Sequence, residues 1–169
     1  MKKSIRWLAI LVAIPSVLIG VLSFQNSPLG YEPVLMTRHA LESAVQLRAS
    51  REIEQPGKIW VYNDYVFVIE QYRGIHVIDN SNSSDPVNLA FIQVDGCTDV
   101  AVNQGLIYAN NAVDLIGIRT DLDQKSITVV SRNRNVLPES SPPDGGQHFD
   151  FDKFRPDGTI IVRYEQYTP

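Results

Sequence analysis

Residues 57–78, GKIWVYNDYVFVIEQYRGIHVI, and residues 98–119, TDVAVNQGLIYANNAVDLIGIR, decide the fold, because the second stretch repeats the first at an offset of 41 residues. No gap is needed to superpose them. The offset aligns five pairs of apolar residues: Ile59 with Val100, Val61 with Val102, Phe67 with Tyr108, Ile75 with Ile116, and Val77 with Ile118. A period of about forty residues in β-like sequence is typical of the blades of a β-propeller.

Each repeat consists of short apolar segments separated by turn residues, which predicts a four-stranded meander. The first repeat is expected to form strands at Lys58–Tyr62, Tyr65–Ile69, Ile75–Asp79 and Val87–Gln93. The second is expected to form strands at Thr98–Asn103, Leu106–Ala109, Asp114–Arg119 and Ser126–Ser131. The segments IWVY, YVFVI and IHVI are apolar on both sides, as expected for a sheet that is covered on both faces. Stacked propeller blades provide that cover.

Four elements of these repeats carry a family resemblance: GxHVIDNSN at residues 74–82, the Pro86-containing turn before FI, Gly-x-x-Asp-x-Ala at Gly96–Ala101, and the Tyr-Ala…Asp-Leu pair at Tyr108–Leu115. Residues 57–117 thereby resemble the LVIVD-repeat β-propeller proteins of bacterial cell envelopes. The resemblance implies a propeller on the envelope surface or in the periplasm, usually lipid-anchored and without an established activity. The chain departs from the family by lacking the lipobox cysteine and by being too short for a whole propeller.

In the C-terminal part of the chain, the sequence predicts a long loop over residues 132–147. A hairpin of His148–Phe154 and Thr159–Glu165 is expected to follow it and to form a partial third blade. Propellers close with four to eight blades, and four would need about 164 residues at this period, more than follow Gly57. The predicted fold class is therefore all-β: an incomplete β-propeller with an N-terminal hydrophobic helix and one short amphipathic helix. Three outcomes remain open for its uncovered ends: a ring shared between copies, a cap formed by the helix, or a truncated relative of a longer protein.

Residues 1–24 form a targeting segment in this interpretation. Lys2, Lys3 and Arg6 precede an uncharged apolar run, Trp7–Phe24, which Pro15 interrupts. A cleaved signal peptide and an uncleaved membrane anchor both fit this pattern. Both place the remainder outside the cytoplasm, in the periplasm or cell envelope, because basic residues before an apolar run stay on the cytoplasmic side.

Residues 25–56 are expected to form a linker and a short amphipathic helix that precede the propeller segment at 57–169. Within Val34–Glu52 one side of a helix would be apolar, with Thr37 as its N-cap. The residues on that apolar side are Ala40, Leu41, Ala44, Val45 and Leu47, and those expected on the solvated side are Arg38, Glu42, Arg48 and Arg51.

Composition excludes some classes of partner. The net charge of −4 and the pI of about 5.3 argue against nucleic acid, because phosphate binding needs a basic face. A single cysteine, Cys97, can form no internal disulfide and no multi-thiolate metal site, so it is expected to be a small buried residue. No cofactor is expected.

Acidic residues are the best candidates for function: Glu70, Asp79, Asp99, Asp114, Asp121 and Asp123, of which the first four are the favoured binding candidates. Asp79 could offer an oxygen to a hard cation, but an Asx turn explains the DNSNSSDP loop without a metal. Asp99 and Asp114 begin predicted strands, where bonds to neighbouring backbone N–H groups are favoured over the alternative, contact with a ligand in the mouth of the propeller channel. His148, Asp150 and Asp152 share one strand face and could hold a divalent cation, although period-two alternation explains the same pattern.

No sequence motif of an enzyme active site is present, such as a nucleophile elbow, a zinc-binding helix or a phosphate-binding glycine loop. The sequence favours a non-enzymatic interaction module of the cell envelope. Its expected partners are the membrane, if the N-terminal segment is uncleaved, and a second copy or another protein that covers the open blade ends. The alternatives are a metal-dependent binder or hydrolase that uses the blade-loop carboxylates, and a truncated remnant of a longer propeller protein.

Overall fold

The computed structural model describes residues 30–145 and 155–166 of the chain. These residues form an all-β fold of three antiparallel sheets, none of which is closed. Helix α1 (Arg38–Ser43) is the single helix of the described ranges. The strands are β1 (Tyr31–Thr37), β2 (Gln46–Ala49), β3 (Pro56–Tyr62), β4 (Tyr65–Glu70), β5 (Gly74–Asp79), β6 (Val87–Gln93), β7 (Val100–Asn103), β8 (Leu106–Asn111), β9 (Asp114–Asp121), β10 (Ser126–Asn133) and β11 (Thr159–Gln166).

Two of the sheets are the predicted meanders. The first sheet has five strands in the order β2-β6-β5-β4-β3, and the second has four in the order β10-β9-β8-β7. All eight strands predicted in the two repeats are confirmed, with ends that differ by at most two residues. The tight turns Asn63–Asp64 and Gln104–Gly105 occupy equivalent places, and Asn63 and Gln104 have nearly the same positive φ, 51° and 50°.

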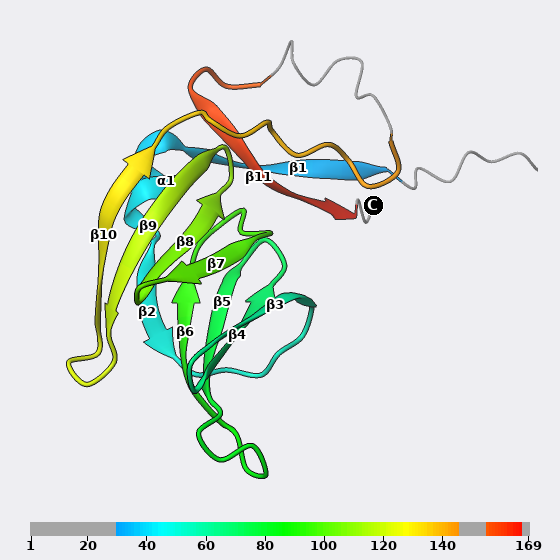
Figure 1. Cartoon of the computed structure of the whole chain (residues 1–169). Coiled ribbons are helices and arrows are strands. Elements are labelled where there is room, and N and C mark those ends of the chain that lie inside the picture. The colour runs from blue at the N-terminus through cyan, green and yellow to red at the C-terminus, as the bar shows by residue number, and fades with distance from the viewer. Residues whose placement is uncertain (1–29, 146–154, 167–169) are drawn as a thin grey trace, which may run out of the picture.

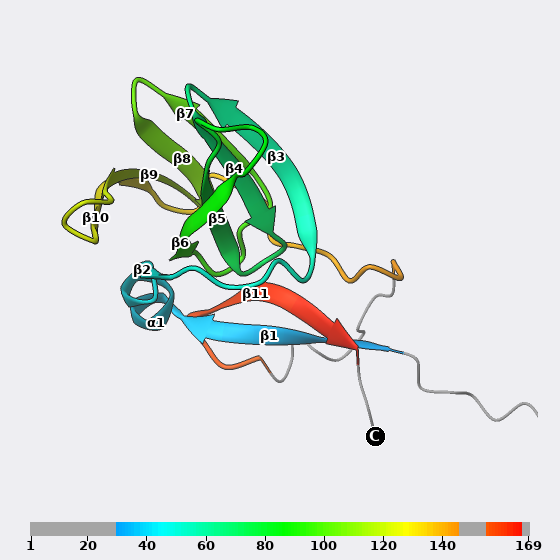
Figure 2. The ribbon, with the colours of Figure 1, turned by 90° about the horizontal axis from the view of Figure 1, so that it is seen from below.

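The two sheets pack face to face, and the main hydrophobic core lies between them (Figures 1 and 2). Alternate residues of each strand point into this core because successive side chains of a strand face opposite ways. Ile69 and Ile75 are paired neighbours in the first sheet, Ile107 and Ile118 are paired neighbours in the second, and all four are at most 2% exposed. Cys97, in the connection between the sheets, is fully buried, as predicted.

The N-terminal part differs from the predicted helix over residues 34–52. Thr37 is the N-cap, as expected, and its hydroxyl accepts a hydrogen bond from the Ala40 amide, but α1 spans only Arg38–Ser43. On either side the chain is extended: Val34 pairs with Arg163 in β11, and Leu47 pairs with Ile92 in β6. Strand partners distant in the sequence thus override the local helical periodicity.

The strand expected to pair with β11 in a partial third blade, residues 148–154, lies outside the described residues. Here β11 pairs with β1, from the other end of the chain, in a two-stranded sheet that we call the terminal ribbon. The ribbon lies across one end of the two larger sheets (Figures 1 and 2). A second, smaller core explains the pairing, since it joins the ribbon to α1 and to the β8–β9 turn through Leu41, Ala112, Val113, Ile160 and Val162.

The predicted N-terminal hydrophobic helix, residues 1–24, lies outside the described residues, as does the strand expected at 148–154. Among the helices of the described ranges, none has the length and apolar character that a membrane crossing requires.

Candidate functional site

Glu70, the first of the predicted binding residues, is completely buried in the first sheet. Its carboxylate accepts hydrogen bonds from the backbone amides of Glu54 (3.0 Å) and Gln55 (2.6 Å), and it lies 3.1 Å from Nε2 of the buried His76. Burial opposes the ionised form, but these hydrogen bonds outweigh it, and the pKa of Glu70 is lowered. Glu70 therefore fastens the β2–β3 connection over the sheet and is not accessible to a ligand.

Asp114 is also completely buried, at the start of β9. Its Oδ2 atom is 2.5 Å from Arg38 Nη1 and 2.6 Å from Arg132 Nη1, and its Oδ1 atom accepts the backbone N–H of Asn135. Burial opposes ionisation, and the bonds from Arg38, Asn135 and Arg132 lower the pKa of Asp114 nonetheless. The expectation that Arg38 lies on a solvated helix face is wrong, because its guanidinium joins this buried carboxylate.

Asp79 and Asp99 are the two more accessible candidates. Asp79 Oδ1 accepts the Ser81 amide at 2.8 Å, which is the predicted Asx turn, and this bond lowers the pKa of Asp79. Asp99 Oδ1 accepts the neighbouring Val100 amide at 2.9 Å, and its Oδ2 lies 2.5 Å from Lys58 Nζ at the surface. Both carboxylates thus have local structural partners.

The structure does not bring these four carboxylates together into one site. Across residues 30–145 and 155–166, no three side chains of the His, Cys, Asp and Glu types are placed to hold a metal ion. His148, Asp150 and Asp152 lie outside the described residues.

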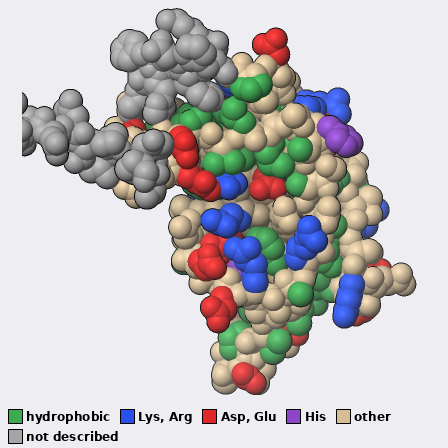
Figure 3. All heavy atoms as spheres, turned by 180° about the vertical axis from the view of Figure 1, so that it is seen from behind, with side chains coloured by type: hydrophobic (Ala, Val, Ile, Leu, Met, Phe, Trp, Pro, Cys, Tyr) green, Lys and Arg blue, Asp and Glu red, His purple; other side chains and the backbone are tan. Residues whose placement is uncertain are grey.

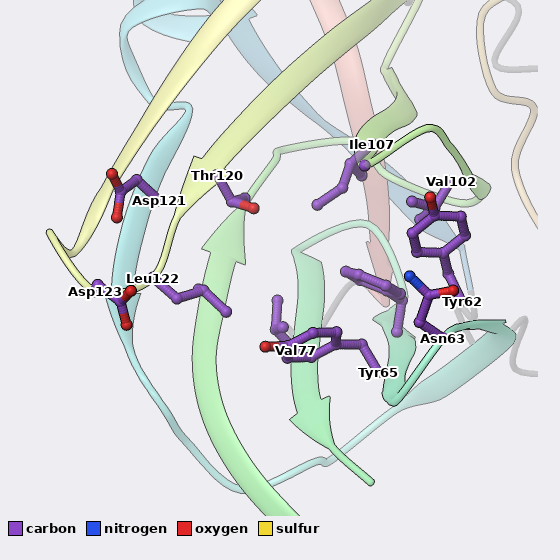
Figure 4. Close-up of a pocket in the computed structure, with 12 residues that line it drawn as sticks. Tyr62, Asn63, Tyr65, Val77, Val102, Ile107, Thr120, Asp121, Leu122 and Asp123 are labelled. Carbon is purple, nitrogen blue, oxygen red and sulfur yellow. The ribbon is translucent and has the colours of Figure 1, made fainter. Parts of the chain in front are cut away.

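A cleft of about 460 Å³ opens between the two sheets at the end opposite the terminal ribbon (Figure 4). We call it the inter-sheet cleft. Buried core side chains form its floor: Phe67, Val77, Val102 and Ile107. Tyr62 and Tyr65, which flank the β3–β4 turn, and Asn63 within it stand on one wall. Thr120, Asp121, Leu122 and Asp123, from the end of β9 and the turn after it, stand on the other.

Figure 4 shows how the walls of the inter-sheet cleft face each other. The Tyr65 hydroxyl points toward the wall that carries Leu122 and Asp123. A second groove of about 630 Å³ adjoins the cleft and shares Tyr65, Leu122 and Asp123 with it, while Arg48 and Lys125 line only that second groove. Sequence reasoning included Asp121 and Asp123 among the acidic candidates but missed the two tyrosines, whose position at the ends of paired strands was the available signal.

The polar side chains that line the inter-sheet cleft are hydroxyls, an amide and carboxylates. The cleft provides two tyrosine hydroxyls, one threonine hydroxyl, one amide and two carboxylates, but no imidazole, thiol or amine.

The outer face of each large sheet, turned away from the core, carries exposed apolar side chains. Ile59 and Val61 in β3 are each 63% exposed, beside the paired Val68 and Val66 of β4. On the second sheet, Tyr108, Leu115 and Val130 are between 37% and 40% exposed. The view from behind shows hydrophobic side chains at the surface among charged ones (Figure 3).

Known proteins provide no relative from which a role could be carried over to the inter-sheet cleft or to the outer faces. No family model, no curated protein and no solved structure matches the chain.

Proposed function

We propose that this chain is a non-enzymatic interaction module of the bacterial cell envelope, built from two LVIVD-type propeller blades that associate through their outer faces. The 41-residue offset between the repeats supports the blade assignment, as do the two four-stranded meanders packed face to face. The basic and apolar character of residues 1–24 supports the envelope location.

One observation carries the proposal: large apolar side chains are exposed on the outer faces of both sheets. Each sheet buries one face against the other, and the β2–β3 connection covers part of the remaining face of the first sheet, where Arg51 stacks on Phe91. Ile59 and Val61 lie beyond that cover and stay exposed. Large apolar side chains left exposed together on a sheet face favour association with another surface.

A second copy of the chain is the partner that the geometry favours. Each copy supplies two blades, so two copies supply four, the smallest number with which propellers close. In such a ring the outer face of the first sheet would pack on the outer face of the partner's second sheet. Both faces that would meet carry exposed apolar residues, Val61 on one and Tyr108 on the other.

The test is the mass of the full chain in a non-ionic detergent, measured by sedimentation at increasing protein concentration. We expect a dimer for the wild type and a monomer for Val61→Ser, because a hydroxyl replaces apolar contact in the interface. Val136→Ser is the matched control, since Val136 is 56% exposed but lies in the loop after β10, and it should leave the dimer intact. A wild type that stays monomeric at about 100 μM, far above the usual dissociation constants of specific complexes, would overturn the proposal.

The envelope location has its own test. An enzyme that becomes active only in the periplasm, fused after Pro169, should be active on the full chain and inactive when residues 1–24 are deleted. Activity in neither fusion would contradict an extracytoplasmic location.

A further inference from the structure

The inter-sheet cleft combines an apolar floor with a rim of one charge sign. Phe67, Val77, Val102 and Ile107 are all buried core residues whose surfaces close the bottom of the cleft. Asp121 and Asp123 are the charged side chains among the residues that line it, and both are exposed at the mouth. A ligand that enters meets hydrocarbon below and negative charge above.

Of the two carboxylates at the rim, that of Asp123 is available to a ligand in the cleft. Asp121 Oδ1 accepts the Gln124 amide at 2.8 Å, and Figure 4 shows this carboxylate turned away from the cleft. Asp123 has no hydrogen bond or ion pair with any of the described residues. Two cationic residues, Arg48 and Lys125, line the adjoining groove and not the cleft itself. Arg48 Nε donates to the side-chain oxygen of Gln93 and not to a carboxylate.

The tyrosines add a second source of attraction for positive charge. Tyr62 and Tyr65 are half-buried, and Figure 4 shows Tyr65 reaching across the cleft toward the wall of Leu122 and Asp123. Aromatic rings attract cations through the negative potential of their faces, and the attraction grows as the site loses water. The aliphatic part of such a ligand would replace water on the floor, which is favourable for every apolar carbon buried.

We propose that the inter-sheet cleft binds a primary ammonium group carried on an unbranched aliphatic chain, with the chain on the apolar floor and the ammonium at the Asp123 carboxylate. A small alkylamine and a lysine side chain of a partner protein share this chemistry. The site is independent of the association proposed above, because it opens at one end of the sheets and not on their outer faces.

The experiment compares three ligands of equal length with the full chain in detergent: hexylammonium, hexanol and hexanoate, each titrated by calorimetry and by amide chemical shifts. We expect saturable binding of hexylammonium, at least about tenfold tighter than that of hexanol, and none of hexanoate, because only the ammonium gains the carboxylate and aromatic attraction. The shifts should be confined to the cleft, at Asn63, Gly105 and Leu122. Equal affinity for hexylammonium and hexanol, or no binding of either, would overturn the proposal.

Two variants identify the carboxylate. Asp123→Asn should weaken the binding of hexylammonium about tenfold while circular dichroism shows the fold unchanged. Asp121→Asn should weaken it less, because the Asp121 carboxylate points away from the cleft. Asp85→Asn removes the same charge from the exposed β5–β6 loop and should leave the affinity unchanged. Equal weakening by Asp85→Asn and Asp123→Asn would show a general charge effect and contradict the site.

Nα-acetyl-lysine methylamide separates the two sources of the ammonium group. Binding as tight as that of hexylammonium supports a lysine of a partner protein, and weaker binding supports a small amine.

Discussion

Asp114 Oδ2 lies 2.5 Å from Arg38 Nη1, although the two residues are 76 positions apart. This pair joins the first residue of α1 to the first residue of β9, and therefore joins the N-terminal segment to the second sheet. Arg132 and Asn135 approach the same carboxylate from β10 and the chain after it. We call these residues the Asp114 cluster, and its geometry leads to the first two predictions.

Asp114→Asn should reduce the free energy of unfolding by about 3–5 kcal/mol, because removing one partner of a buried ion pair leaves the other charge uncompensated. Arg132, whose side chain is 12% exposed, would lose its carboxylate. Urea unfolding followed by circular dichroism measures the change.

Arg134→Gln is the control for that variant. Arg134 also binds a carboxylate, that of Glu42, but its side chain is 60% exposed. Surface pairs contribute about 0–1 kcal/mol, so the control should unfold almost as the wild type does. Similar losses in the free energy of unfolding from the two variants would show that burial does not determine how much Asp114 contributes to stability.

Acid should destabilise the protein through the same residue. The pKa values of Asp114 and Glu70 are lower in the folded protein than their ordinary values of 3.8 and 4.5. A lowered carboxyl pKa contributes stability that is complete above the ordinary value and is lost as pH falls through the folded value. The free energy of unfolding should therefore fall between about pH 5 and pH 2, and its slope should be shallower in Asp114→Asn. An unchanged slope in the variant would show that Asp114 does not contribute to acid unfolding.

The two meanders could be predicted from the sequence because their information is local. Apolar residues alternate with turn residues over short distances, and each strand pairs with the next one along the chain. The turn at Asn63–Asp64 places β4 beside β3, and every later hairpin follows the same rule. Residues near each other in the sequence thus decide most of the fold.

The N-terminal segment could not be predicted in this way. Leu41 fits the apolar side of a longer helix, but Val34 and Leu47 are placed by β11 and β6, whose positions local periodicity does not contain. The helical pattern places Arg38 on a solvated face, but in the structure Arg38 binds Asp114. Local periodicity cannot predict this contact, because Asp114 lies on a strand distant in the sequence.

The inter-sheet cleft falls between these two cases. Asp121 and Asp123 could be identified as candidates from their position in a loop. Their juxtaposition with Tyr62 and Tyr65 depends on how the two sheets stack, since the two walls come from different sheets. Sequence reasoning therefore found one wall of the cleft and not the other.

Cys97 should resist thiol reagents until the protein unfolds. Its side chain is fully buried, and burial raises its pKa to about 12. The thiolate is the reactive form, so at about pH 8 the native thiol should be inert to a chromogenic disulfide reagent and react in urea. Val136→Cys, which adds an exposed thiol, should react at once with one equivalent. Rapid reaction of the wild type without urea would show that the core between the sheets opens readily.

Gly74→Ala should be among the most destabilising of the glycine substitutions, because two constraints coincide there. Gly74 begins β5 with φ at +150°, and a Cβ atom would lie 2.1 Å from the carbonyl oxygen of Ile92 in β6. The paired strands would have to separate, and we expect a loss of about 2–4 kcal/mol in the free energy of unfolding.

Gly105→Ala separates the two constraints. Gly105 has φ at +74°, but a Cβ atom there would meet nothing within 4 Å. The variant should therefore lose only the conformational contribution of about 1 kcal/mol. Thermal and urea unfolding of both variants measure the difference, which isolates the close approach of β5 and β6. If Gly105→Ala proves as destabilising as Gly74→Ala, backbone conformation alone, and not the contact with Ile92, is the reason that glycine is required at position 74.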